Sequence, residues 1–342
     1  MTRQAQVLVL GASGELGARV VRLLGTLAPQ VPCVRASRRG REGCLALDVT
    51  QPPPAGLLGA GDVVIDVVGP YEHDPSAWVR ACGAAQAHFV DLSERPEFIE
   101  RVARAGEDSP CAVLSGCSTV PALAASLLRD MADGAPDGDD TERVEVLLSM
   151  GSRHRPSRGL VYSLLRPLGR ALPEDPKARA FRGLTTRTLT SGVRRRYGRF
   201  PCPDLGLGCP VRFWSGFDRG ALVWALSAVS WVTPWVPSWL LLRVAAPLSR
   251  VAAVASLVGG EAGSLRLERH RRDGAPDVLE IHAARDGLDV PALPAVWAAM
   301  RLVGQTTSRA RRLDEVIDAP AQRAALEQSG YVVHRPSVSR SR

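Results

Sequence analysis

Three glycines near the start of the chain have the spacing of a dinucleotide-binding turn. They follow a short apolar run at 7–10 and precede a stretch with helical periodicity. In such a turn the first glycine permits a tight bend, the second lets the backbone approach a pyrophosphate, and the third lets the helix pack close to the strand. The helix N-terminus adds free N–H donors and a partial positive charge. We predict dinucleotide contacts at Gly11, Ser13, Gly14, Glu15, Leu16 and Gly17; a glycine-rich turn without a ligand is the alternative.

The end of the second predicted strand bears on which nicotinamide cofactor binds. An acidic residue there would bind the free 2′-hydroxyl of NAD. The sequence instead has Ser37, Arg38 and Arg39, whose hydroxyl and guanidinium groups suit the 2′-phosphate of NADP. We predict NADP as the cofactor; solvated loop arginines are the alternative reading. Asp48, after a third short strand, is predicted to contact the adenine, or else to cap a turn.

Residues at the ends of three later strands are candidates for contacts with the nicotinamide and for proton transfer. One of these strands, at 62–71, is continuously apolar and ends in a Gly-Pro-Tyr turn. The predicted cofactor contacts at its end are Val68, Gly69 and Pro70, and the predicted catalytic residues are Tyr71, Asp91 and Cys117, with Ser93 as a further donor.

Tyr71 is the first candidate among these donors, because a phenol can protonate a carbon or oxygen that receives hydride. Its alternative role is to pack against the nicotinamide. Cys117 fits a small buried residue at least as well as a nucleophile.

The elements that must position these residues alternate along the first part of the chain. Apolar strands are separated by predicted helices at 75–87, 96–105 and 121–131. Such alternation predicts the α/β class, with a Rossmann-type doubly wound parallel sheet. Ligands of such sheets bind beyond the carboxyl ends of the strands, where all the candidate residues lie.

A series of short motifs resembles the NADP-binding domain of the saccharopine dehydrogenase-like oxidoreductases. The series runs in order through Gly11-Ala-Ser-Gly-Glu-Leu-Gly17, Ala36-Ser-Arg38, Val68-Gly-Pro-Tyr71, Ala81-Cys82, Phe89-Val-Asp91-Leu92 and Cys117-Ser-Thr-Val-Pro121. The resemblance implies NADP-linked hydride transfer and leaves the substrate open, since the family includes saccharopine-forming reductases, polyamine-pathway dehydrogenases and lipid-modifying enoyl reductases. The chain departs from the family pattern at Glu72-His-Asp-Pro75 and at Ser93-Glu94, where a further glycine is usual.

The second half of the chain predicts a separate α+β substrate domain. We place the NADP-binding domain at 1–135, a polar linker at 132–141, the substrate domain at 142–305, and a C-terminal helix with a basic tail at 306–342. Alternating stretches predict a strand at 143–150 and a hairpin of 263–270 with 277–283. Helices are expected at 291–303 and 313–328. Arginines crowd the sequence from 153 to 199, which indicates either an anionic site or a solvated surface.

An apolar, tryptophan-rich segment lies at 214–258. It holds Trp214, Trp224, Trp231, Trp235 and Trp239, and no charged residue occurs from Gly220 to Leu242. Prolines interrupt it, so each side is shorter than the ~20 apolar residues that a spanning helix needs. Three interpretations stay open: a buried helical pair, an apolar pocket or lid for a hydrophobic substrate such as an acyl chain, and an interfacial membrane hairpin.

Composition argues against several classes of protein. The net charge of +8 comes from dispersed arginines, and Lys177 is the only lysine, so we expect no nucleic-acid partner. The absent Tyr-x-x-x-Lys pair excludes short-chain dehydrogenase chemistry. No histidine has metal-ligand spacing, so no metal is predicted. The cysteines form no Cys-x-x-Cys motif and the first strand starts within a few residues of Met1, which together predict reduced thiols and a cytoplasmic location.

These observations predict an NADP-dependent oxidoreductase acting on a small or hydrophobic substrate, with acyl or polyketide substrates included. Two alternatives stay open: a non-catalytic NADP-binding regulator or scaffold, and a membrane-associated lipid enoyl reductase. Peripheral contact with a membrane or a carrier protein, and a homodimer, also stay open.

Overall fold

The computed structural model describes residues 3–40, 43–133, 140–153, 156–255 and 259–335, which form two compact units. Unit 1 comprises Met1–Ser126 and Asp289–Ala319, and unit 2 comprises Leu127–Leu288 and Pro320–Arg342. Most of the predicted linker, at 134–139, and the basic tail from 336 onward lie outside the described residues.

Unit 1 is built on a six-stranded parallel sheet. Its strand order is β3 (Leu45–Ala46), β2 (Cys33–Ser37), β1 (Val7–Leu10), β4 (Val63–Asp66), β5 (His88–Asp91) and β6 (Val113–Leu114). Every residue of β1, β4 and β5 is buried, as continuous apolar runs predict for strands covered on both faces. The order reverses between β1 and β4, which is the position where such sheets bind ligands. The predicted Rossmann-type sheet is confirmed.

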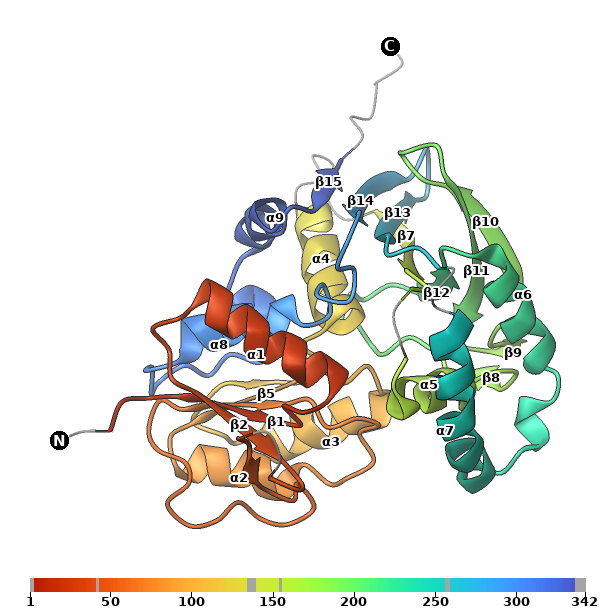
Figure 1. Cartoon of the computed structure of the whole chain (residues 1–342). Coiled ribbons are helices and arrows are strands. Elements are labelled where there is room, and N and C mark those ends of the chain that lie inside the picture. The colour runs from red at the N-terminus through yellow and green to blue at the C-terminus, as the bar shows by residue number, and fades with distance from the viewer. Residues whose placement is uncertain (1–2, 41–42, 134–139, 154–155, 256–258, 336–342) are drawn as a thin grey trace. The chain divides into compact units, whose positions relative to one another are not determined.

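Helices cover both faces of this sheet. In Figure 1, α1 (Glu15–Leu27) and α8 (Leu293–Leu302) lie on one face, and α2 (Ser76–Ala84) and α3 (Pro96–Gly106) lie on the other. The predicted helix at 121–131 begins as a π-helix, η1 (Thr119–Ala124), and continues as α4 (Ala125–Asp133). The amide of Leu123 donates to Ser118 O, five residues earlier, at 3.1 Å. This turn is wider than an α-helical turn and accommodates Pro121, which has no N–H to donate.

The segment Asp289–Ala319 belongs to unit 1, although the predicted boundaries divided it between the substrate domain at 142–305 and the C-terminal part at 306–342. Its helix α8 contacts α1, β4 and β5 and is almost entirely buried. Asp289 accepts a hydrogen bond from Arg19 at 2.8 Å and another from Arg22, so α1 is attached to the residues that lead into α8. The boundaries differ because this packing joins distant parts of the chain and leaves no local signal in the composition.

Unit 2 is organised around a seven-stranded mixed sheet. Its order is β10 (Leu184–Thr188), β11 (Arg194–Phe200), β12 (Val211–Phe217), β7 (Thr141–Met150), β13 (Gly263–Arg271), β14 (Asp277–Ala283) and β15 (Val332–His334). The predicted hairpin is present, with β13 and β14 antiparallel from Gly263–Ala283 to Arg269–Asp277. The central pair β7 and β12 is parallel, which makes the sheet mixed and confirms a second domain of α+β character.

Shorter elements complete unit 2. They are most of α4, α5 (Arg158–Leu165), the hairpin of β8 (Ala171–Leu172) and β9 (Asp175–Arg179), α6 (Gly220–Val229), the 3-10 turn η2 (Thr233–Trp235), α7 (Ser238–Ala255) and α9 (Ala319–Gln328). The predicted helix at 313–328 is wrong: a 3-10 turn, η4 (Leu313–Glu315), in unit 1 is followed by the separate helix α9. Pro320 explains the break, because proline is tolerated in the first turn of a helix and not in its interior.

The tryptophan-rich segment forms α6, η2 and α7, apart from Trp214, which lies in β12. Trp224, Trp231, Trp235 and Trp239 are each more than half exposed, so the buried helical pair is excluded as their role. Among the described helices, none combines the length and the apolar character needed to cross a membrane.

The attachment of α1 to the returning segment predicts a stability change. We expect Asp289→Asn to lower the free energy of unfolding by about 2 kcal/mol, because hydrogen bonds to charged groups contribute roughly 1.5–3 kcal/mol. Chemical denaturation followed by circular dichroism measures the change. Asp286→Asn, at an exposed position nearby, is the matched control, and equal stability of the two variants would contradict the assignment.

Candidate active site

The glycine turn brings the start of α1 against the end of β1. Gly11 has a φ of +80°, and a Cβ on it would lie 3.0 Å from Val67 O and from a methyl group of Val68. A Cβ on Gly17 would lie 2.1 Å from Gly11 O, so no larger residue fits there without moving the helix. The three glycines therefore have the roles that their spacing predicts.

The N-terminus of α1 is open to an anion. Its N-cap is Gly14, which has no side chain, and the hydrogen bond from Ala18 N to Gly14 O, at 2.8 Å, leaves the preceding amides of the first turn without a partner in the helix. Ser13 and Gly14 are exposed, whereas Glu15 and Leu16 are half-buried. These free amides and the helix dipole fit a pyrophosphate group.

The end of β2 lies beside this turn. Ala36 O accepts hydrogen bonds from Gly11 N at 3.0 Å and from Ala12 N at 2.9 Å. The next residue, Ser37, is buried, and its Oγ has no hydrogen-bond partner within the part of the chain that the structure describes. Arg38 and Arg39 are exposed, and among the described residues neither guanidinium has a hydrogen bond or an ion pair. An unpartnered hydroxyl followed by two available guanidinium groups fits a phosphate on the adenosine ribose.

Asp48 has the turn-capping contacts that were the alternative to an adenine contact. Its Oδ1 accepts hydrogen bonds from Thr50 N at 3.0 Å and from Thr50 Oγ1 at 2.8 Å. These bonds hold the pKa of the Asp48 carboxyl below its ordinary value, with a smaller contribution from Arg38. The adenine contact stays a prediction.

The Gly-Pro-Tyr turn after β4 is held by buried polar groups. Asp66 accepts a hydrogen bond from Val68 N at 2.9 Å, and its other carboxylate oxygen lies 2.8 Å from His73 Nε2. The Gly69–Pro70 peptide bond is cis, and Tyr71 has a φ of +58°. Arg95 donates to the carbonyl oxygens of Pro70, at 3.0 Å, and of Tyr71, at 3.2 Å. The position of Tyr71 is therefore set by contacts on both sides of the turn.

Tyr71 has features of both roles considered for it. Its ring packs edge-on against Phe98, with 5.0 Å between the centroids. Its hydroxyl lies 3.5 Å from Asp66 O. Burial raises the pKa of the phenol well above its ordinary value, and the carboxylates of Asp66, Asp91 and Glu94 raise it further. The hydroxyl is therefore protonated at neutral pH and is a weaker acid than an ordinary phenol, which favours the packing role over proton donation.

Asp91 links the ends of β5 and β6. It is fully buried and accepts hydrogen bonds from Ser93 N at 2.8 Å, Ser115 Oγ at 2.8 Å and Gly116 N at 3.2 Å. Burial raises the pKa of its carboxyl to about 7, against the opposing effect of these hydrogen bonds. The nearby Asp66 also raises it. This carboxyl joins two strand ends and has a proton affinity suited to neutral pH.

Cys117 lies at the same edge of the sheet as a small buried residue. Its side chain is 1% exposed. Burial raises the pKa of the thiol, and the nearby Asp91 raises it further. Thiolate is the nucleophilic form, so these surroundings oppose a nucleophilic role for Cys117.

The residues that sequence reasoning missed are Asp66 and His73. An acidic residue inside the apolar run at 62–68 was an available signal, since a buried carboxylate needs partners. His73 lies in the tetrapeptide where the chain departs from the family pattern, and the departure supplies the partner of Asp66. The residues of the second departure, Ser93 and Glu94, also form hydrogen bonds. Ser93 Oγ accepts a hydrogen bond from Arg95 N at 3.1 Å, and Glu94 accepts one from Ser118 Oγ at 3.0 Å.

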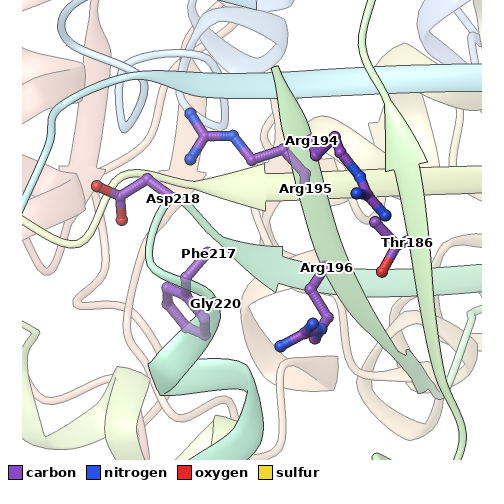
Figure 2. Close-up of a pocket in the computed structure, with 7 residues that line it drawn as sticks. All are labelled: Thr186, Arg194, Arg195, Arg196, Phe217, Asp218 and Gly220. Atoms are coloured by element: carbon purple, nitrogen blue, oxygen red, sulfur yellow. The ribbon is translucent and has the colours of Figure 1, made fainter. Parts of the chain in front are cut away.

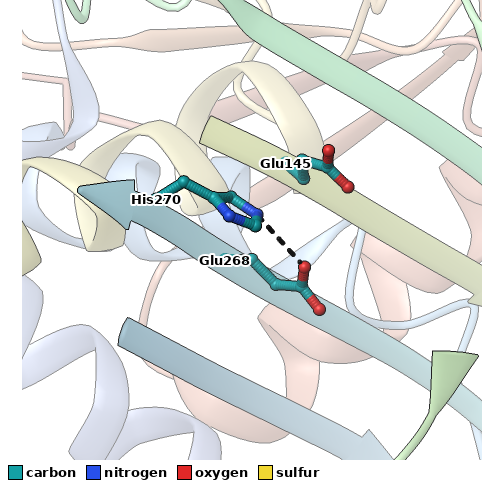
Figure 3. Close-up of side chains that lie close together, drawn as sticks. All are labelled: Glu145, Glu268 and His270. Atoms are coloured by element: carbon teal, nitrogen blue, oxygen red, sulfur yellow. Dashed lines mark ion pairs between the residues drawn. The ribbon is translucent and has the colours of Figure 1, made fainter. Parts of the chain in front are cut away.

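Unit 2 contains a cluster with the composition of a metal site, although no metal was predicted. Glu145 on β7 and Glu268 and His270 on β13 bring one ligating atom each within 4.8 Å of one another (Figure 3). However, Nδ1 of His270 faces a guanidinium nitrogen of Arg143 at 3.2 Å, and its Nε2 faces Glu268 at 3.4 Å. With Nδ1 accepting and Nε2 protonated, the imidazole has no lone pair left for a cation.

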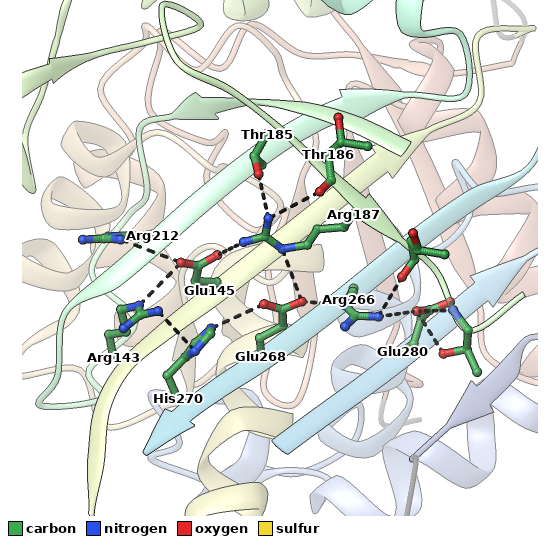
Figure 4. A network of polar contacts seen from close by, with 12 residues as sticks. Arg143, Glu145, Thr185, Thr186, Arg187, Arg212, Arg266, Glu268, His270 and Glu280 are labelled. Atoms are coloured by element: carbon green, nitrogen blue, oxygen red, sulfur yellow. Dashed lines mark hydrogen bonds and ion pairs between the residues drawn. The ribbon is translucent and has the colours of Figure 1, made fainter. Parts of the chain in front are cut away.

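Arginines surround the same cluster (Figure 4). Arg187 lies 3.1 Å from Glu145 and 3.7 Å from Glu268, and Arg266 lies 2.6 Å from Glu268 and 3.3 Å from Glu280. These cations compensate the buried carboxylates. The contacts therefore form an ion-pair network across the sheet, which opposes binding of a further cation.

The arginine-rich stretch also lines a hollow of about 300 Å³ in unit 2 (Figure 2). Arg194, Arg195 and Arg196 come from β11, and Asp218 and Gly220 come from the junction of β12 with α6. The guanidinium of Arg196 lies 5.1 Å from the ring centroid of Trp224. The hollow is thus positively charged and adjoins the tryptophan-rich helices.

The raised pKa of Asp91 predicts a pH dependence of stability. A carboxyl with a pKa of about 7 in the folded protein and an ordinary value of 3.8 when unfolded binds its proton more tightly in the folded state. The stability it contributes is therefore present at low pH and lost as pH rises through about 7.

We expect Asp91→Asn to reduce the difference in free energy of unfolding between about pH 5 and about pH 8, because asparagine keeps one acceptor oxygen but does not titrate. Chemical denaturation at both pH values provides the measurement. Asp108→Asn, at an exposed position, should retain the dependence of the parent protein. An unchanged dependence in Asp91→Asn would refute the assignment.

Comparisons with known proteins identify the fold. The sequence matches no protein-family model and no curated protein. The structure is similar to apo saccharopine dehydrogenase (L-Glu forming) from Saccharomyces cerevisiae, with a TM-score of 0.60 and 10% identity over 98% of this chain and 100% of that chain. GenD2 from gentamicin A biosynthesis, in complex with NAD, has a TM-score of 0.45 and 13% identity, covering 98% of each chain. An engineered D-amino acid dehydrogenase bound to NADP+ has a TM-score of 0.44 and 16% identity, covering 92% of this chain and 94% of that chain. The predicted resemblance is thus confirmed at the level of the fold: this chain has the fold of saccharopine dehydrogenase.

Proposed function

We propose that the protein is an NADP(H)-dependent oxidoreductase of the saccharopine dehydrogenase-like type. The observation that carries the proposal is the open N-terminus of α1 beside Ser37, Arg38 and Arg39 at the end of β2, whose side-chain donors have no hydrogen-bond partner among the described residues. The fold supports it, because saccharopine dehydrogenase is an oxidoreductase with this architecture. The bound nicotinamide would supply or accept a hydride.

The glycine turn and the end of β2 would hold the two phosphate-bearing parts of the cofactor. The amides of the first turn of α1 bind the pyrophosphate, and Ser37, Arg38 and Arg39 bind the 2′-phosphate. Val68, next to Gly11 at the switch point between β1 and β4, begins the turn that lines the nicotinamide side of the site. Gly69 and Pro70 continue this turn.

Tyr71 would donate a proton to the substrate atom that receives the hydride. The contacts of Arg95 with the carbonyl oxygens of Pro70 and Tyr71 fix the turn that carries the phenol. Asp91 would position the site, because its carboxylate accepts hydrogen bonds from the residues that follow β5 and β6. The substrate class that we propose is a small or hydrophobic molecule, with acyl-bearing molecules included.

The cofactor assignment predicts a selective loss of affinity. We expect the double variant Arg38→Gln, Arg39→Gln to bind NADPH about tenfold to a hundredfold more weakly, because charge-assisted hydrogen bonds to the 2′-phosphate are lost. NADH lacks this phosphate, so its affinity should not change. Quenching of protein fluorescence measures both affinities. Arg80→Gln, at an exposed position on α2, is the control for removing charge. A parallel loss for both cofactors would show that the arginines do not bind the 2′-phosphate.

The donor assignment predicts a separation of binding from catalysis. We expect Tyr71→Phe to keep NADPH affinity and to lower kcat about a hundredfold, because phenylalanine retains the packing on Phe98 but has no proton to donate. NADPH oxidation with imines, enones and acyl thioesters measures turnover. If Tyr71→Phe turns over as fast as the parent protein, the phenol is a packing residue. If the parent protein binds NADPH and oxidises it with none of these substrates, the regulator alternative is favoured.

A further inference from the structure

The helices α6 and α7 and the turn η2 expose an unusual concentration of tryptophan. The exposed fractions are 56% for Trp224, 61% for Trp231, 85% for Trp235 and 60% for Trp239. We call these four residues the tryptophan face. Val232 and Val251, in the same segment, are also mostly exposed. Single exposed apolar residues are ordinary, but four exposed indoles within the short segment 224–239 are typical of a surface that binds something.

This exposure is not caused by poor packing of the helices. Val223 of α6 is fully buried with Leu168 and Phe181, and Leu241 and Ala245 of α7 are buried with Tyr162. Each helix therefore has one apolar side in the core of unit 2 and another apolar side in water. A helix that is apolar on all sides is expected to be covered on all sides. The buried sides of both helices already pack in the core of unit 2. The partner that covers the tryptophan face must therefore be another molecule.

Arginines accompany the tryptophans. The guanidinium of Arg182 lies 4.1 Å from the ring centroid of Trp231, and that of Arg243 lies 5.4 Å from Trp239. Arg196, from the arginine-lined hollow, lies over Trp224. The sequence from 219 to 260 contains three arginines and no aspartate or glutamate. The covering surface must therefore accept apolar rings and positive charge together.

An anionic lipid surface has this chemistry, and a second copy of the chain does not. In a symmetric dimer the same patch would face itself, so arginines would oppose arginines without an acidic residue from this segment to pair them. At a membrane the indole rings lie at headgroup depth, and arginines extend toward lipid phosphates. We propose that the tryptophan face docks unit 2 on the surface of an anionic membrane. This contact is independent of the proposed hydride transfer.

Vesicle flotation of the full-length protein tests the proposal. We expect flotation with vesicles of phosphatidylcholine and phosphatidylglycerol, and weaker flotation with phosphatidylcholine alone or at high salt. Trp235→Ala should lower the partition coefficient about tenfold, because it removes the most exposed indole. Arg243→Gln should lower it about fivefold with anionic vesicles and leave it nearly unchanged with neutral ones.

Matched controls separate docking from folding and from cofactor binding. Leu27→Ala, an exposed apolar residue of unit 1, should float like the parent protein. Trp235→Ala should keep the unfolding midpoint and the NADPH affinity of the parent protein, since this side chain is mostly in water. Failure to bind NADPH would count against the proposed function and would leave the flotation result intact.

Two outcomes would overturn the proposal. One is that the parent protein does not float with anionic vesicles, or that the Trp235→Ala variant floats as well as the parent protein does. The other is that the parent protein does not float but sediments as a dimer, and that the Trp235→Ala variant sediments as a monomer. This result would assign the tryptophan face to a second copy of the chain.

Discussion

The close approach of α1 to β1 is the contact on which the candidate site depends. Gly17 lies so near the carbonyl of Gly11 that no side chain fits between the helix and the turn. This approach directs the first-turn amides beyond the end of β1. The same turn bonds to Ala36, so the end of β2 is placed beside it. The close approach of two backbones thus decides where the groups that we propose to bind phosphate lie, before any charged side chain is considered.

The other strand ends are organised by buried carboxylates. Asp66 holds the amide of Val68 and the imidazole of His73, and Asp91 holds groups from two segments that follow β5 and β6. Each carboxylate satisfies backbone donors that would otherwise be unpaired where the sheet ends. The same burial raises the pKa of Asp91 and of the Tyr71 phenol. The groups that stabilise the turn therefore also set the proton affinity of the side chains available for catalysis.

Local patterns predicted the parallel sheet, the glycine turn and the β13–β14 hairpin, because each depends on residues close together in sequence. Three features had no such signal. The return of Asp289–Ala319 to unit 1 depends on contacts with α1, far away in the chain. The pairing of His73 with Asp66 needed the turn geometry. The sequence shows the tryptophans concentrated in one apolar segment, but composition alone does not tell whether their side chains face the core or water. The break before Ala319, in contrast, has a local signal, because Pro320 fits the first turn of a helix and not its interior.

The return of the chain to unit 1 makes this unit discontinuous, with most of unit 2 inserted into it. The ion pair of Arg19 with Asp289 joins residues 270 positions apart. During synthesis from the N-terminus, β4 and β5 emerge long before α8, the helix that contacts them. Their apolar residues stay without the cover of α8 while most of unit 2 is synthesised. Exposed strands are prone to misassociation during this period. Unit 1 is consequently completed only after most of unit 2 has been made, although its glycine motif is among the first segments to be translated.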